Sequence, residues 1–154
     1  MSAVRLIFDT IIIALLIKQK IMKSVPISTI MTKNVVCVTP EQKLIEVKHI
    51  YEKKKFHHHI PVTKDGKLVG MVSLIDFMYK INGAGLDDEN AIYHQLNVKD
   101  IMSPNPFTIG TDATIESVAK EFAKGRYRAI PIVKNESILG IVTTADLIRF
   151  YMKK

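Results

Sequence analysis

The stretch Gly70–Phe77 reads GMVSLIDF, and the stretch Gly140–Leu147 reads GIVTTADL. Both begin with a glycine, continue with apolar residues, and place a hydroxyl side chain three positions before an aspartate. The two stretches lie 70 residues apart, from position 70 to position 140. Self-similarity at a fixed distance indicates an internal repeat, so the chain is predicted to contain two related units.

The repetition continues towards the N-terminus of each unit. TIMTKNVVCV at 29–38 returns as DIMSPNPFTI at 100–109, and HHHIPV at 57–62 returns as YRAIPI at 127–132. The offset is 71 residues for the first pair, from 31 to 102 at the methionines, and 70 for the second, from 61 to 131 at the prolines. The first copy has therefore gained one residue before its proline.

Apolar periodicity predicts the same elements in both copies. Leu44, Val47 and Tyr51 recur at the spacing of an amphipathic helix. The same spacing recurs in the second copy at Ile115, Val118, Ala119 and Phe122. In the first copy, Thr39, Pro40 and Gln42 predict the N-cap, first turn and capping box of that helix.

Each helix is followed by a short apolar strand, a tight turn, a second strand and a closing helix. The predicted fold class is α+β, with two pseudo-symmetric repeats in the order strand, helix, strand, strand, helix. One such unit buries little apolar surface alone, so the two are expected to pack through their sheets around a shared core. The predicted boundaries are 24–82 for the first repeat, 83–96 for a linker ending in a short helix, and 97–154 for the second.

Residues 1–23 are predicted to form an apolar helix. The uninterrupted apolar run from Ile11 to Ile17 is shorter than the ~20 residues of a spanning helix, and Asp9 and Arg5 interrupt a longer one. No small-residue cleavage site follows, which argues against a signal peptide. We expect this helix to pack on its own domain or on a partner subunit, and contact with a membrane surface is the alternative.

With these paired motifs in view, the chain resembles a tandem CBS-domain pair over about 24–152. This regulatory module occurs in cystathionine beta-synthase, inosine monophosphate dehydrogenase and the gamma subunit of AMP-activated protein kinase. The resemblance implies two clefts between the repeats that bind AMP, ADP, ATP or S-adenosylmethionine. In that family the motif aspartate binds the ribose, the motif hydroxyl lies near ribose and phosphate, and a basic residue ahead of the strand proline faces phosphate. The resemblance also implies a homodimer.

The implied ligand-binding residues are His58, Ile60, Gly70, Ser73 and Asp76 in the first copy, and Arg128, Ile130, Gly140, Thr143 and Asp146 in the second. A hydroxyl three residues before an acid is equally the pattern of a helix capping box, which needs no ligand. The two glycines indicate a close approach of the backbone to either a ligand or the facing strand. We expect Arg128 and Asp146 to form the stronger set, because a guanidinium binds phosphate through two hydrogen bonds.

The three adjacent histidines in HHHIPV invite a metal interpretation. Side chains alternate between the two faces of a strand, so His57 and His59 are expected to point away from the face of His58. A zinc site would then need His49 or His94 to arrive from another element. The sequence therefore favours one cleft histidine and no metal site.

Composition narrows the remaining function classes. The net charge of +7 favours anionic partners, but the excess lysines lie in short runs without a basic helix face, so no nucleic-acid binding is expected. Cys37 is the only cysteine, which excludes an intrachain disulfide and favours a cytoplasmic protein. Its side chain is expected to fill space in the interior and not to act as a nucleophile.

No nucleophile with a base, phosphate loop or metal-ligand motif is evident, so the chain is predicted not to be an enzyme. It is predicted to be a stand-alone regulatory module that requires no cofactor, binds an adenosine compound and transmits this to a regulated protein. The alternative is a ligand-free structural or protein-interaction module.

Overall fold

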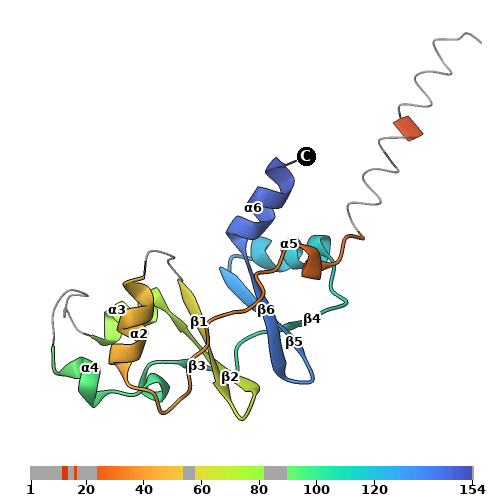
Figure 1. The fold of residues 1–154 in the computed structure, drawn as a ribbon. Coiled ribbons are helices and arrows are strands. Elements are labelled where there is room, and N and C mark those ends of the chain that lie inside the picture. Colours follow the sequence, from red (N-terminus) through yellow and green to blue (C-terminus); the bar gives the residue numbers. More distant parts are fainter. Residues whose placement is uncertain (1–11, 14–15, 17–23, 54–57, 82–89, 154) are drawn as a thin grey trace, which may run out of the picture.

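The computed structural model describes residues 12, 13, 16, 24–53, 58–81 and 90–153 of the chain. Two α/β halves lie side by side, with their β-hairpins in the middle of the molecule and helices at the outer ends (Figure 1). The predicted α+β architecture of two repeats is therefore confirmed. Of the predicted N-terminal helix, only Ile12, Ile13 and Leu16 lie within the described residues, and each is helical.

The first half is built around an antiparallel hairpin between two helices. Its elements are η1 (Ile27–Thr29), α2 (Leu44–Tyr51), β1 (His59–Lys64), β2 (Lys67–Ser73) and α3 (Leu74–Lys80). Ile60 lies opposite Val72, and both side chains are fully buried. The turn uses Asp65 and Gly66 in left-handed conformations, which is the geometry that the Asp-Gly pair predicts.

The second half repeats this arrangement with the same register. Its elements are α4 (Ile92–Gln95), η2 (Val98–Asp100), β3 (Ser103–Pro104), β4 (Ile109–Gly110), α5 (Ile115–Ala123), β5 (Ala129–Lys134), β6 (Ser137–Thr143) and α6 (Thr144–Met152). Ile130 lies opposite Val142, and the pairing shifts after Ile132 just as it shifts after Val62 in the first half. The two hairpins therefore share their register and its irregularity. The leading strands differ, because β4 pairs in parallel with β5, whereas the strand predicted before α2 is reduced to a single bridge between Val38 and Val62.

The leading segment of each repeat belongs structurally to the other half. β3 pairs with β2 of the first half, and Val98 and Ile101 lie in the first core. Conversely, the backbone of Thr32 exchanges two hydrogen bonds with Ile141 of β6, and Ile27 lies in the second core. The two halves are thus intertwined, because each sheet and each core is completed by chain from the other repeat.

The glycines that open the two repeated motifs lie under methionines from these crossing segments. A Cβ on Gly70 would lie 2.6 Å from the Met102 sulfur, and one on Gly140 would lie 2.7 Å from the Met31 sulfur. Of the two roles predicted for these glycines, the structure assigns the close approach to the facing segment of the other repeat.

The predicted capping box of the first helix is wrong in its position. Thr39 to Gln42 form a turn, in which the Thr39 amide donates to the Gln42 side chain at 2.5 Å, and α2 begins only at Leu44 after Lys43. The beginning of α2 is set by long-range pairing, because the Leu44 amide donates to the Leu96 carbonyl at 3.1 Å and Lys43 bridges to Asn97.

Candidate functional site: two unequal clefts and a central cavity

Three cavities surround the two repeated motifs. The first, which we call the Asp76 cleft, has a volume of about 290 Å³ and is lined by both halves of the chain. The second, the central cavity, measures about 370 Å³ and lies between the beginnings of α3 and α6. The third, the Asp146 cavity, measures about 570 Å³ and lies between α6 and the segment around η1.

The Asp76 cleft combines an acceptor, cations and aromatic rings. Asp76 in the first turn of α3 accepts a hydrogen bond from the Ser73 hydroxyl at 2.6 Å and remains half-buried. Arg126 and Arg128, just before β5, are exposed and line the same cleft from the other half. The cleft therefore offers a carboxylate to hydroxyl groups and two guanidinium groups to an anion.

A stacked aromatic pair forms another wall of the Asp76 cleft. The rings of Phe107 and Tyr127 are nearly parallel, with centroids 4.8 Å apart and an angle of 7° between planes. Their counterparts by the repeat offsets are Val36 and His57, so the other copy lacks this pair. Stacked aromatic side chains present a π-face on which a nucleobase can lie.

The central cavity brings together corresponding residues of the two copies. Its lining includes His58 and Arg128, and also Ser73 and Thr143, the hydroxyl residues that cap α3 and α6. His59, Ser73 and Arg128 line the Asp76 cleft as well, so the two cavities adjoin. A ligand in the Asp76 cleft could therefore extend towards the middle of the molecule.

Two histidines line the central cavity, against the prediction of one. His58 and His59 both do so, and His57 lies outside the described residues. The alternation rule fails because β1 begins only at His59, so His58 does not have strand geometry relative to it. Burial lowers the pKa of His59, neighbouring His58 lowers it further, and Asp76 partly opposes both effects.

The Asp146 carboxylate has a different environment from that of Asp76. Oδ2 accepts hydrogen bonds from the Thr143 amide and hydroxyl, both at 2.7 Å, and Oδ1 accepts from Arg149. Asp146 is 7% exposed, and its cavity also contains Phe150 and Lys153. The structure thus places Arg128 in a cavity with Asp76, whereas Asp146 lines a separate one.

Some of the predicted site residues lie away from the cavities. Ile60 and Ile130 are fully buried in the two cores, and Gly70 and Gly140 lie under the crossing segments. Four residues that the sequence did not single out as site residues also line the Asp76 cleft: His59, Arg126, Phe107 and Tyr127. Alignment of the two repeats could have indicated Phe107 and Tyr127, because these aromatic residues stand where the first repeat has Val36 and His57.

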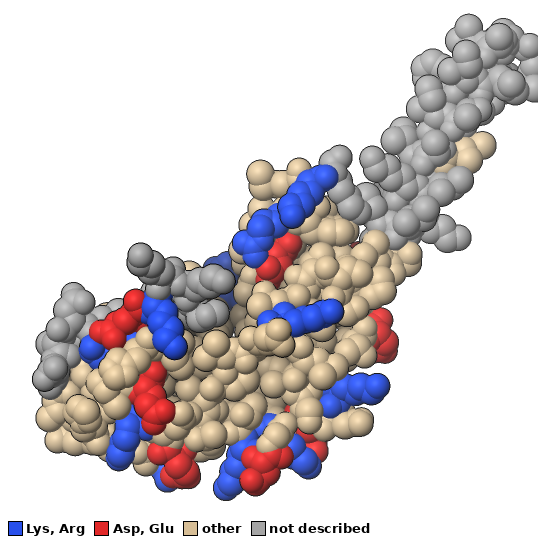
Figure 2. All heavy atoms as spheres, viewed as in Figure 1, with Lys and Arg blue, Asp and Glu red and all other residues tan. Residues whose placement is uncertain are grey.

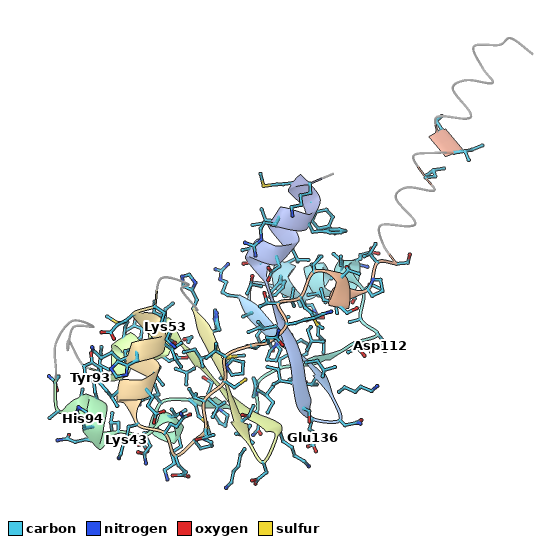
Figure 3. The ribbon with its side chains drawn as sticks, viewed as in Figure 1. Lys43, Lys53, Tyr93, His94, Asp112 and Glu136 are labelled. Carbon is cyan, nitrogen blue, oxygen red and sulfur yellow. The ribbon has the colours of Figure 1, made fainter. Side chains whose placement is uncertain are left out.

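Among the described residues, no group of three or more His, Cys, Asp or Glu side chains is placed to hold a metal ion. His94 lies on α4 at the outer end of the first half, away from the beginning of β1 (Figure 3). In the part of the chain that the structure describes, no helix is long and apolar enough to cross a membrane.

The sequence profile of the CBS domain family matches the chain twice, over residues 27–83 and 98–153. The chain belongs to the CBS domain family. The two matches correspond to the two repeats, so the predicted identification as a CBS pair is confirmed. The clefts described above are therefore clefts of a CBS pair.

Several larger proteins contain a stretch of similar sequence. Protein MJ1404 of Methanocaldococcus jannaschii, which is uncharacterized, is 27% identical over 154 residues, covering 96% of this chain and 37% of that protein. MJ0188 of the same organism is 30% identical over 133 residues, covering 85% and 46% respectively. The inosine-5'-monophosphate dehydrogenase of Korarchaeum cryptofilum is 28% identical over 116 residues, covering 75% and 22%. The chain thus spans less than half the length of each of these relatives.

Solved CBS pairs share the fold. The structure of CBSX2, a CBS-pair protein from Arabidopsis thaliana, in complex with AMP matches 84% of this chain and 97% of its own, with a TM-score of 0.70 and 23% identity. The CBS domain pair of protein MJ0100, in complex with 5'-methylthioadenosine and S-adenosyl-L-methionine, covers 84% and 98%, with a TM-score of 0.69 and 24% identity. CBSX2 and MJ0100 are thus CBS pairs whose structures contain adenosine compounds.

Proposed function

We propose that this CBS pair is a non-catalytic regulatory module that binds an adenosine compound in the Asp76 cleft. The observation that carries the proposal is the joint lining of this cleft by Asp76, Arg128 and the aromatic pair, which come from both repeats. The adenosine ligands of similar CBS pairs support the choice of ligand class.

The three chemical parts of an adenosine compound each have a counterpart in the cleft. The base would stack on Phe107 and Tyr127, and the ribose hydroxyls would donate to Asp76. A 5' anionic group would lie between Arg126 and Arg128. Since these residues come from both halves, a ligand would bridge the repeats and favour one of their arrangements, which is how a binding module transmits a signal.

A homodimer is part of this proposal. The closing helices of the two repeats expose apolar side chains that lack cover in a single chain. These residues are Ile75, Met78 and Tyr79 on α3, and Ile148, Tyr151 and Met152 on α6. An exposed apolar surface of this kind favours association, and a second copy would bury the same surfaces on both chains. Light scattering on the purified chain tests this, and a monomeric mass would exclude it.

The first experiment is a thermal-shift panel on the full chain with AMP, ADP, ATP, S-adenosylmethionine and NAD. A ligand at a hundredfold excess over its Kd stabilises the folded state by about 2.7 kcal/mol. For a chain of this size that corresponds to a rise in Tm of about 5–10 °C. The Asp76→Asn variant should lose this rise, because its amide no longer accepts two charge-assisted hydrogen bonds.

The matched control is Asp65→Asn. Asp65 lies in the hairpin turn with φ 51°, and its counterpart in the second turn is Asn135 with φ 50°, so the exchange preserves the local geometry. This control should keep the full ligand-induced rise in Tm. A chain that responds to none of the five compounds would contradict the proposal and favour the ligand-free interaction module.

The charge distribution argues against nucleic-acid binding. Figure 2 shows acidic and basic side chains interspersed along the edge of the visible face, with no continuous basic area. Exposed lysines also pair with nearby acids, as Lys67 does with Glu136 and Lys99 does with Glu41. A CBS pair with this charge pattern is expected to bind polynucleotide weakly, without the steep salt dependence of a dedicated surface.

A further inference from the structure

The two motif aspartates have opposite accessibility. Asp76 is half-buried at the wall of a cleft that also contains two arginines and an aromatic pair. Asp146 is 7% exposed, and both of its carboxylate oxygens accept hydrogen bonds from groups of the chain itself. A ribose that approached Asp146 would have to compete with these donors, and at Oδ1 with the charged Arg149.

The donor that distinguishes the two sites is Arg149. It lies one turn after Asp146 on α6 and pairs with Oδ1 of that carboxylate. The residue at the corresponding position of α3 is Tyr79, which is 81% exposed, and among the described residues no Lys, Arg or His forms a salt bridge with Asp76. One amino-acid difference therefore gives one motif aspartate an internal cation that the other does not have.

We propose that Arg149 determines which cleft binds ligand: by pairing with Asp146 it excludes a ribose from that aspartate and restricts each chain to one adenosine compound, in the Asp76 cleft. The guanidinium pairs with Oδ1, the oxygen to which the capping hydroxyl does not donate, and this is the oxygen that a ribose would use. This inference rests on the proposed function, and it adds the stoichiometry and the residue that sets it.

A substitution of Arg149 can remove this pairing without disturbing the core. The side chain is 63% exposed, whereas that of Asp146 is 8% exposed, so replacing the arginine changes the surface and leaves the core intact. Arg149→Tyr installs the residue type of the first repeat. Arg149→Lys retains a cation that can reach the carboxylate from the same turn.

The test is isothermal titration calorimetry of the full chain with AMP as the probe. The unmodified chain should bind one AMP per chain, and Arg149→Lys should do the same. Arg149→Tyr should bind two, with at least a tenfold gain in affinity at the second site. Lys153→Ala is the matched control, because Lys153 lines the same cavity without pairing with Asp146, and it should still bind one.

The outcomes separate this inference from the proposed function. Two AMP molecules on the unmodified chain, or one on Arg149→Tyr, would overturn the role of Arg149. If the unmodified chain binds no AMP, the proposed function fails for this ligand, and Arg149→Tyr still decides the inference. If Arg149→Tyr then binds one AMP, the inference that Arg149 excludes ligand from Asp146 is supported. If Arg149→Tyr binds no AMP, that inference is overturned.

Discussion

The two repeats of this CBS pair share the register and turns of their hairpins and the hydroxyl caps of α3 and α6, but they differ in the side chains around their motif aspartates. Asp76 is half-buried in a cleft with Arg128 and an aromatic pair, whereas Asp146 is almost fully buried and pairs with Arg149. The comparison shows that a duplicated fold conserves the scaffold of a site without conserving access to it. Under the proposed function, ligand binding depends on a few positions that the repeat motif does not include.

The two motif glycines offer the strongest test of whether the scaffold is equivalent in the two repeats. A Cβ at position 140 would lie 2.8 Å from the Thr32 carbonyl oxygen, which is held by hydrogen bonds with Ile141. At position 70 the atom nearest to an added Cβ is the sulfur of the flexible Met102 side chain, and the Ser103 carbonyl oxygen is 3.3 Å away. Gly140→Ala should therefore lower the free energy of unfolding by about 2–3 kcal/mol, and Gly70→Ala by about 1 kcal/mol.

Urea unfolding of the two glycine variants measures this difference. Equal losses of stability would show that the crossing segments of the two halves shift equally well to accommodate the added methyl group. The m-value should stay constant if both variants keep the folded state intact.

The aromatic wall is the second distinguishing feature. Phe107→Val places in the Asp76 cleft the residue type that the first repeat has at the corresponding position, Val36. The substitution removes one stacking surface for a base. Stacking of a base on an aromatic side chain contributes about 1–3 kcal/mol, so the affinity for AMP should fall about five- to tenfold at the lower end of that range. Phe107 is 39% exposed, so the variant should remain folded.

Calorimetry with AMP tests the aromatic wall. Phe150→Leu serves as control, because Phe150 lines the Asp146 cavity and should not affect affinity. An unchanged affinity in Phe107→Val would place the base elsewhere in the cleft.

The smallest expected effect concerns His59, whose counterpart is Ala129. The pKa of His59 is lowered by burial from its ordinary value near 6.5, so the unfolded chain takes up this proton before the folded chain does. Stability should therefore fall slightly as the pH drops below about 6.5, and His59→Ala should remove part of that fall.

Thermal unfolding at pH 7.5 and at pH 5.5 measures the contribution of His59. His49→Ala is the control, since His49 is exposed on α2. An identical fall in Tm for the unmodified chain and for His59→Ala would show that other groups account for the pH dependence.

The sequence by itself determined the repeat, the order helix, strand, strand, helix within each copy, the CBS resemblance and the hydroxyl-to-aspartate caps. These depend on local patterns, because periodicity, turn residues and capping pairs act over a few neighbouring residues. Ser73 and Thr143 accordingly cap α3 and α6 as the motif predicts.

Only the tertiary structure decided which residues share a cleft. Packing within the second repeat brings Phe107 beside Tyr127, packing of the two halves brings Asp76 into one cleft with Arg128, and no local pattern records either contact. Burial of Asp146 beside Arg149 likewise depends on the packing around α6. Contacts between segments that are distant in sequence arise from the packed fold, so one sequence can predict the site's chemistry but not the accessibility of each cleft.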